Sequence, residues 1–217
     1  MTFRSADLVV TRWGARFQGR PIPCAVGRSG IGAKSREGDG LTPEGVFHVD
    51  TILFRPDRVR PHGLTASPWF RLCNNGSRSE DPGEAINLYR TARDSSPYLR
   101  VPPIPVRPIL PGDIWSDDPE DPGYNSRVTA ADMRGDRGLG TTLFSHERLR
   151  RPDPVYDIVA VLDFNRPAPV PGRGSAIFLH IWRQPRNRTE GCVAFRRQDL
   201  TEILTRWTPR SRVIIQR

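Results

Sequence analysis

Short apolar runs, separated by glycine and proline, make up most of the hydrophobic pattern, which is typical of a β-rich chain. Apolar and polar positions alternate over 6–13 and resume over 21–26, on either side of a Gln18-Gly19-Arg20 turn signal. This arrangement predicts a strand hairpin. Residues 45–54 are rich in β-branched and aromatic side chains and predict a third strand.

The C-terminal third carries the strongest local patterns. Continuous apolar runs at 156–164 and 176–182 predict two buried strands, and 212–216 predicts a last one. Between the strands at 176–182 and 212–216, an amphipathic helix is indicated by the i, i+3, i+4, i+7 spacing of Leu200, Ile203, Leu204 and Trp207. We therefore expect one helix over about 198–208, with Asp199 in its first turn.

The middle of the chain is rich in proline. Twelve of the 22 prolines fall between Pro56 and Pro122, a density that argues against long helices and central strands. We expect a long proline-rich loop over 56–125, acting either as a lid or as a surface excursion around 61–101. A chain of 217 residues fits one domain over 1–217. The predicted fold is mostly β, a β-sandwich or distorted barrel with one or two helices.

The amino-acid composition limits the classes of molecule that the protein is expected to bind. The net charge is +9, and Lys34 is the only lysine, so the basic side chains are nearly all arginine. Arginine pairs carboxylates and phosphates equally well, and the bias also fits a GC-rich genome. The arginines are dispersed and no nucleic-acid-binding motif accompanies them, so a nucleic acid is not the expected partner. No run is long and apolar enough to span a membrane, and no leader is visible, which leaves both an internal protein and one with a removed leader open.

Three cysteines are too few for a disulfide scaffold, and none lies in a C-x-x-C pair. A bridge between Cys24 and Cys73 and two inert thiols are both open interpretations. The acidic stretch between Trp115 and Asn125 lacks the spacing of a calcium loop. No metal or organic cofactor is expected.

Cys192 and His180 are the candidate chemical pair. His180 ends an apolar run, and Cys192 follows Gly191 after a polar loop. A cysteine is nucleophilic only as its thiolate, and a histidine on a neighbouring strand is able to take the proton. Gly191 permits a sharp turn or a close backbone approach that forms an oxyanion hole. By itself, however, a single histidine and a single cysteine at this spacing are more often inert core residues.

These residues resemble the catalytic segment of the L,D-transpeptidase family with its YkuD-type domain, which has a strand histidine, a loop and Ser/Thr-x-Gly-Cys. Thr42-Pro43-Glu44-Gly45-Val46-Phe47 matches the family's Thr-Pro-x-Gly-x-Phe segment. A subgroup of the family shares further stretches, which lie at 34–40, 54–58, 115–125, 156–157 and 171–180. Thr189-Glu190-Gly191-Cys192 departs from the commoner Ser-His-Gly-Cys pattern, and Ala194 stands where the family usually has arginine.

The resemblance implies roles for specific side chains. Cys192 is the expected nucleophile, His180 its base, and Gly191 part of the oxyanion site. Glu190 is expected to orient His180 or receive an amine, unless it is simply a solvated acid, and Arg196 or Arg197 to replace the missing cation. The candidates for contact with substrate are Thr189, Arg183, Arg173, Arg186, Trp115, Tyr124 and Asn125.

The resemblance also implies a function. The expected enzyme is a cysteine acyltransferase that cross-links the carboxylate-rich stem peptides of peptidoglycan, with 3-3 diaminopimelate or 1-3 L-alanine–diaminopimelate linkages. If water replaces the amine, the same site is a carboxypeptidase or endopeptidase. The sequence also leaves open a catalytically inactive wall-binding protein and a basic binding protein without enzymatic activity. We expect a monomer located in the periplasm or cell wall.

Overall fold

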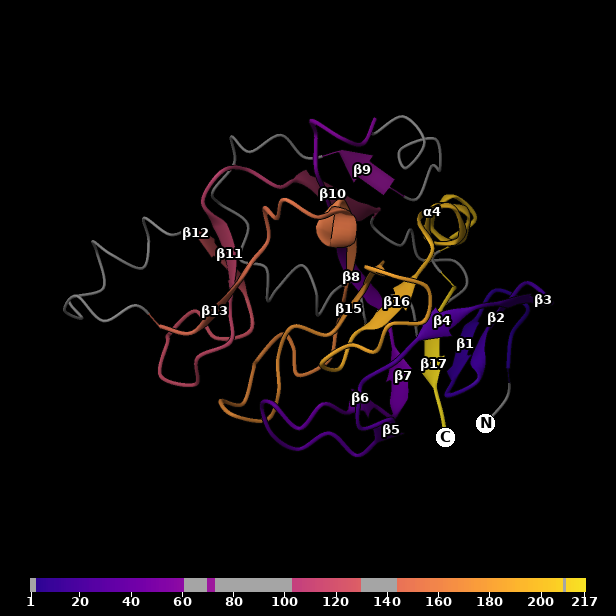
Figure 1. Ribbon diagram of the computed structural model, residues 1–217, viewed down its shortest axis with the longest axis horizontal. Coiled ribbons are helices and arrows are strands. Elements are labelled where there is room, and N and C mark those ends of the chain that lie inside the picture. The colour runs from indigo at the N-terminus through magenta and orange to yellow at the C-terminus, as the bar shows by residue number, and fades with distance from the viewer. Residues whose placement is uncertain (1–2, 61–69, 73–102, 130–143, 209) are drawn as a thin grey trace.

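The structure, a computed structural model, describes residues 3–60, 70–72, 103–129, 144–208 and 210–217. Strands in several sheets and a single α-helix make up the described part, which confirms the mostly β prediction. In Figure 1 a five-stranded sheet lies on the right, a seven-stranded sheet crosses the centre and a three-stranded sheet lies on the left. Most of the predicted lid, 61–101, lies outside the described residues.

The five-stranded sheet joins the two ends of the chain. Its order is β3 (Arg20–Ile22), β2 (Gly14–Phe17), β1 (Leu8–Thr11), β17 (Val213–Ile215) and β7 (Gly45–Phe47). The Gln18-Gly19 turn is confirmed, with both residues at positive φ. The predicted pairing of its flanks is wrong, because the chain also turns at Arg12-Trp13 and β2 pairs with both β1 and β3.

The seven-stranded sheet forms the middle of the molecule. Its order is β4 (Cys24–Ala25), β16 (Val193–Phe195), β15 (Phe178–Ile181), β14 (Ile158–Leu162), β8 (Val49–Phe54), β10 (Ile104–Pro108) and β9 (Phe70–Leu72). The predicted strand at 45–54 divides at His48, so that β7 lies in one sheet and β8 in the other. The backbone N–H of His48 donates to Asp163 Oδ1 at 2.8 Å at this point.

The proline-rich region contains a strand that the sequence argued against. β10 lies between β8 and β9, so the expectation that no central strand forms there is wrong. It pairs with each neighbour over only three residues, and Pro105 and Pro108 lie near its ends. Proline removes one ladder hydrogen bond at its own position, a loss that a short strand tolerates.

Smaller elements cover the sheets. The three-stranded sheet has the order β12 (Arg127–Thr129), β11 (Asp113–Ser116) and β13 (His146–Arg148), and β5 (Ile31–Gly32) pairs with β6 (Thr42–Pro43). The predicted helix is α4 (Arg197–Thr205), and a 3-10 turn, η1, spans Pro154–Tyr156.

The core has two parts, one on each face of the seven-stranded sheet. Side chains of the five-stranded sheet, the seven-stranded sheet and α4 form the larger cluster. On the opposite face, Phe178 of β15 packs with Trp115 of β11 and Tyr156 of η1. Alternate residues of β15 therefore point in opposite directions, and His180 shares the face of Phe178.

Candidate active site

A cavity of about 470 Å³ lies on the face of the seven-stranded sheet that is turned toward the three-stranded sheet. His180 and Cys192 both line it. Side chains from the three-stranded sheet, from η1 and from the 183–191 loop form its other walls. The two residues singled out from the sequence therefore share one cavity.

Strand register brings His180 and Cys192 together. β15 and β16 are parallel, with Leu179 opposite Val193 and His180 opposite Ala194. Cys192 lies two positions before Ala194, so it points to the same face as His180. Strand spacing and rise place the two Cα atoms about 8 Å apart on the diagonal.

The surroundings of Cys192 favour its protonated thiol form. Its Sγ donates a hydrogen bond to the carbonyl oxygen of Ala176 at 3.1 Å. Burial raises the pKa of the thiol to about 12, although the backbone N–H of Phe178 opposes this shift; Glu147 raises the pKa further and Lys34 lowers it. The thiolate therefore forms only when a base removes the proton.

His180 is a neutral base by the same reasoning. Its Nδ1 lies 2.8 Å from the carbonyl oxygen of Ile181, and because a carbonyl only accepts, Nδ1 carries the proton and Nε2 the lone pair. Burial lowers the pKa of His180 to about 4. The ring packs edge-on against Tyr156 with 5.4 Å between centroids, which fixes its plane.

The turn before Cys192 is held by Thr189 and Gly191. Thr189 Oγ1 donates to the carbonyl oxygen of Cys192 at 2.6 Å and accepts from the N–H of Gly191 at 3.2 Å. Gly191 has a φ of +147°, and a Cβ there would lie 2.9 Å from the carbonyl oxygen of Leu41. Only glycine fits this turn without strain. The N–H of Gly191 is thus engaged within the turn.

Glu190 does not contact His180. Its carboxylate pairs with Arg28 at 2.7 Å at an exposed position, and the partner of His180 Nδ1 is the backbone of Ile181. The expectation that Glu190 orients His180 is therefore wrong. Glu190 still lines the cavity.

A comparison with models of protein families identifies the family of this chain. The model of the L,D-transpeptidase catalytic domain, YkuD, matches residues 6–215. The chain belongs to the L,D-transpeptidase catalytic domain family. No curated protein and no solved structure matches it.

In this YkuD domain, Tyr156, Glu147 and Arg151 form a connected group at the cavity, and the sequence prediction gave none of the three a role. Tyr156 Oη donates to Glu147 Oε1 at 3.1 Å, and Arg151 pairs with the same oxygen at 3.3 Å. Burial raises the pKa of Tyr156 well above its usual range, and the charge of a Cys192 thiolate adds to this shift. The shared Tyr156-Asp157 stretch was a signal for Tyr156. Glu147 had no such signal, because it lies on β13 of the three-stranded sheet, outside the stretches that resemble the family.

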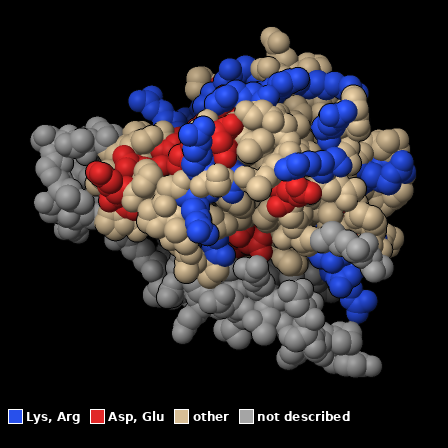
Figure 2. Space-filling view, turned by 90° about the horizontal axis from the view of Figure 1, so that it is seen from below, with Lys and Arg blue, Asp and Glu red and all other residues tan. Residues whose placement is uncertain are grey.

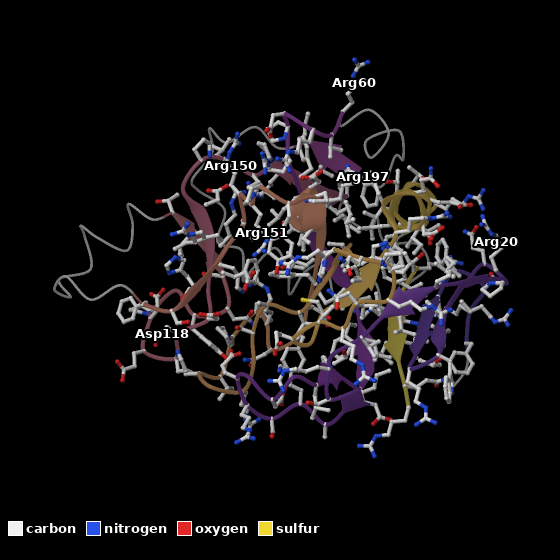
Figure 3. The ribbon with its side chains drawn as sticks, viewed as in Figure 1. Arg20, Arg60, Asp118, Arg150, Arg151 and Arg197 are labelled. Atoms are coloured by element: carbon white, nitrogen blue, oxygen red, sulfur yellow. The ribbon has the colours of Figure 1, made fainter. Side chains whose placement is uncertain are left out.

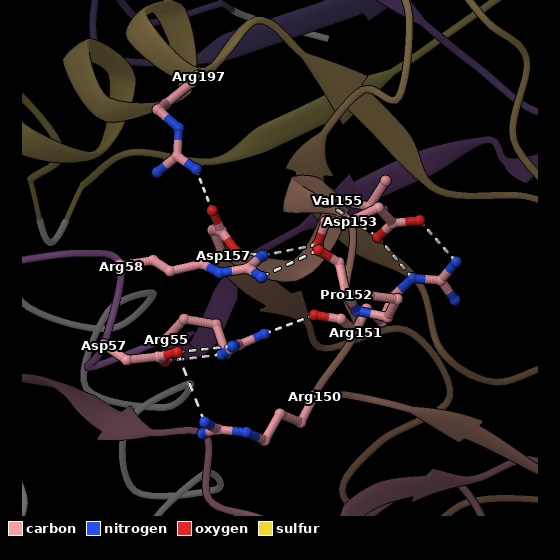
Figure 4. Close-up of polar contacts among 10 residues, drawn as sticks. All are labelled: Arg55, Asp57, Arg58, Arg150, Arg151, Pro152, Asp153, Val155, Asp157 and Arg197. Carbon is pink, nitrogen blue, oxygen red and sulfur yellow. Dashed lines mark hydrogen bonds and ion pairs between the residues drawn. The ribbon is translucent and has the colours of Figure 1, made fainter.

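A network of ion pairs holds the segment that carries Tyr156 (Figure 4). Arg151 forms two hydrogen bonds of 2.9 Å with Asp153, whose side chain also caps η1. Asp157 pairs with Arg58 at 3.2 Å and with Arg197. Arg197 is therefore engaged with the scaffold behind the site.

Trp115, Tyr124 and Asn125 lie behind the cavity and do not line it. Trp115 is 2% exposed and its Nε1 donates to Asn125 Oδ1 at 3.2 Å. Tyr124 Oη donates to Glu37, and Asn125 Oδ1 accepts from the N–H of Ala176 at 3.1 Å. The expectation of a substrate-facing wall is wrong. Asn125, itself held by Trp115, instead fixes Ala176, the residue whose carbonyl oxygen accepts from Cys192.

The candidate arginines separate into cavity and surface groups. Arg183 lines the cavity and pairs with Asp153 at 3.2 Å. Arg196 does not line it, because its guanidinium pairs with Asp199 of α4. Arg173 and Arg186 are also outside its lining. Neither Arg196 nor Arg197 replaces the missing cation.

Lys34 supplies a cation at the cavity. It forms a buried pair with Asp39 at 2.6 Å. Burial alone raises the pKa of Asp39, but hydrogen bonds from Lys34 and two backbone N–H groups outweigh it, and the pKa is lowered. The ammonium of Lys34 also lowers the pKa of Cys192.

The remaining charges are spread over the surface. Figure 2 shows basic side chains at several separate places on one face, with acidic side chains between them. Arg20 and Arg60 project at the margins of Figure 3, whereas Arg151 lies near its centre. Within the described ranges, no three His, Cys, Asp or Glu side chains are grouped to hold a metal, and no helix is long and apolar enough to cross a membrane.

Proposed function

We propose that this protein is a peptidoglycan L,D-transpeptidase that joins stem peptides through a thioester on Cys192. The observation that carries the proposal is the shared cavity of Cys192 and His180 in a chain of this family. The proposed subgroup is the one with Thr-Glu-Gly-Cys. Its substrate implies a place in the periplasm or cell wall, and we propose that the protein acts as a monomer.

The proposed reaction has two steps. His180 Nε2 takes the proton of Cys192 as the sulfur attacks a carbonyl of the donor stem, and the bond to the leaving amine breaks to give the thioester. The leaving amine takes the proton from His180. An acceptor amine then attacks the thioester, the electron pair of the C–S bond returns to Cys192, and the proton that the amine loses passes by way of His180 to the sulfur.

Charge on the tetrahedral intermediate needs hydrogen-bond donors. The N–H of Gly191 donates to Thr189 within the turn. We therefore assign the oxyanion to the N–H of Cys192, and the donor carboxylates to the basic side chains of the cavity, Lys34, Arg183 and Arg188.

The test is incubation of the purified protein with disaccharide tetrapeptide and pentapeptide fragments, followed by mass spectrometry of the products. Cross-linked dimers are expected, and fragmentation of the dimers separates 3-3 from 1-3 linkages. Shortened monomers alone would identify the hydrolase instead.

Two cysteine variants make the test specific. Cys192→Ala should form no dimer and no covalent adduct. Cys24→Ala is the matched control, because Cys24 is a buried core thiol, with its pKa raised by burial to about 12, and it does not line the cavity. Undiminished product from Cys192→Ala would refute the nucleophile assignment.

A further inference from the structure

The active cavity is lined by side chains of both charges. Asp117 and Glu147 lie on the side formed by the three-stranded sheet, where β13 pairs with β11 and Glu147 stands opposite Trp115. Lys34, Arg183 and Arg188 lie among the other lining residues together with Glu37 and Glu190, and Arg151 lines the cavity beside Glu147. A transpeptidase handles two partners, a donor rich in carboxylates and an acceptor amine, and the cavity offers basic side chains to the first and acidic side chains to the second.

Glu147 is only partly neutralised. Its carboxylate accepts from Tyr156 Oη at 3.1 Å and from Arg151 at 3.3 Å, but Arg151 makes its shorter contacts of 2.9 Å with Asp153. The Glu147 side chain is 35% exposed, so a ligand in the cavity can reach it. Burial raises its pKa, the contacts from Tyr156 and Arg151 oppose this shift, and Asp117 and Asp153 add to it.

Two further polar atoms of the cavity lack protein partners among the described residues. Asp117 Oδ1 and Ser175 Oγ are both buried without a hydrogen bond. Ser175 is only 5% exposed and lines the cavity. Buried polar atoms are normally paired with protein or with water, so these two are available to a ligand that brings its own donors. An ammonium ion offers three donors and no acceptor.

Glu147 also lies within electrostatic range of the sulfur. Its carboxylate raises the pKa of Cys192, and Cys192 in turn raises the pKa of Tyr156, which Glu147 holds by a hydrogen bond. A group bound at Glu147 is therefore near the atom that carries the acyl group.

We propose that Glu147 and Asp117 bind the acceptor amine as its ammonium ion and that Glu147 takes the first of the two protons this amine loses. The inference rests on the function proposed above. The ammonium transfers one proton to the Glu147 carboxylate, and the freed lone pair forms the bond to the thioester carbon. As the C–S bond breaks, its electrons return to sulfur, and the second proton of the new amide nitrogen passes to His180 Nε2. Glu147 then releases its proton to water.

The experiment separates the two half-reactions. A donor stem with its free side-chain amine acetylated acylates Cys192 but cannot act as acceptor, and intact-protein mass spectrometry follows the acyl-enzyme. An unblocked stem is then added as acceptor. Glu147→Gln keeps the acceptor for Tyr156 but removes the charge, so acylation should stay within about threefold of wild type. The rate constant kcat/KM for the acceptor should fall about 10- to 100-fold.

A second acceptor tests the charge itself. Hydroxylamine is neutral at pH 7, and it should react with the acyl-enzymes of wild type and Glu147→Gln at equal rates. The matched control is Glu44→Gln, because Glu44 is 44% exposed and pairs with Arg217 at the same 3.3 Å, outside the cavity. This control should leave both half-reactions unchanged.

Three results would overturn the inference: an unchanged acceptor rate in Glu147→Gln, an equal loss of acylation, or an equal loss with hydroxylamine. If wild type forms no acyl-enzyme with any donor, the proposed function fails first, which is a separate result. Should Glu147→Gln fail to fold, Asp117→Asn carries the same test, with an expected loss of about 2- to 10-fold for the charged acceptor alone.

Discussion

The turn that presents Cys192 depends on the missing side chain of Gly191. An alanine there must adopt a φ of +147° and place its Cβ 2.9 Å from the carbonyl oxygen of Leu41 and 3.3 Å from Ile177. Strain at such a φ costs about 1–3 kcal/mol. The contact with a backbone oxygen adds about 1–3 kcal/mol, because the 41–42 segment must move. Gly191→Ala should therefore lower the free energy of unfolding by about 2–6 kcal/mol.

Gly112 provides the matched control for the strain. It has a φ of +86°, and a Cβ there would meet nothing within 4 Å. Gly112→Ala should therefore show the strain alone. Urea unfolding followed by circular dichroism measures both variants, and the difference isolates the contact with Leu41. If the two substitutions cost the same within about 0.5 kcal/mol, the close approach does not hold the turn.

The other predictions concern buried polar groups. Asn125→Ala removes four hydrogen bonds, to Trp115, Ala176 and two backbone carbonyls, and should lower the free energy of unfolding by about 3–5 kcal/mol in urea. Lys34→Met leaves the buried Asp39 carboxylate without its counter-charge, which should cost about 3–5 kcal/mol, and adding Asp39→Asn should restore part of it. The pKa of His180 falls from 6.5 to about 4 on folding, so the unfolded chain takes up this proton first as the pH drops. Wild type should lose about 3 kcal/mol between these two pH values relative to His180→Gln, measured by urea unfolding across pH; equal pH profiles would contradict the burial of a neutral imidazole.

Local patterns were sufficient to predict the elements that carry the pair. Continuous apolar runs mark β14 and β15, and the helical spacing marks α4, because burial on both sides or on one face leaves a short-range signature. The same reasoning from local patterns failed at His48, where the predicted strand divides between two sheets, and at β10, where no central strand was expected. Whether a strand changes sheets, or takes up a place between two others, depends on partners far along the chain.

The cavity walls illustrate the same limit. Trp115 and Asn125 have the residue types of a binding wall, but the strand β11 turns Trp115 onto Phe178 in the core, with 4.9 Å between ring centroids. Glu147 reaches the cavity only because β13 pairs with β11 in one register. A shift by one residue would turn its side chain to the opposite face. Sequence motifs identify residue types, whereas register decides which of them face the substrate.

The resting state of the pair has a consequence for the reactivity of Cys192. Burial shifts the two pKa values in opposite directions, raising that of the Cys192 thiol to about 12 and lowering that of the His180 imidazole to about 4. At neutral pH both groups are therefore uncharged. A preformed thiolate–imidazolium pair would instead keep the thiol reactive at low pH. Alkylation of Cys192 by iodoacetamide, followed by peptide mass spectrometry, should therefore keep rising up to and beyond about pH 9, because the reactive species is the thiolate. A rate that levels off below pH 7 would show an ion pair and refute the neutral resting state. The carbonyl oxygen of Ala176 accepts a hydrogen bond from the Cys192 thiol, and Asn125 holds Ala176 in place through its backbone N–H. Because Asn125→Ala releases Ala176, this variant should increase the alkylation rate of Cys192 at pH 7.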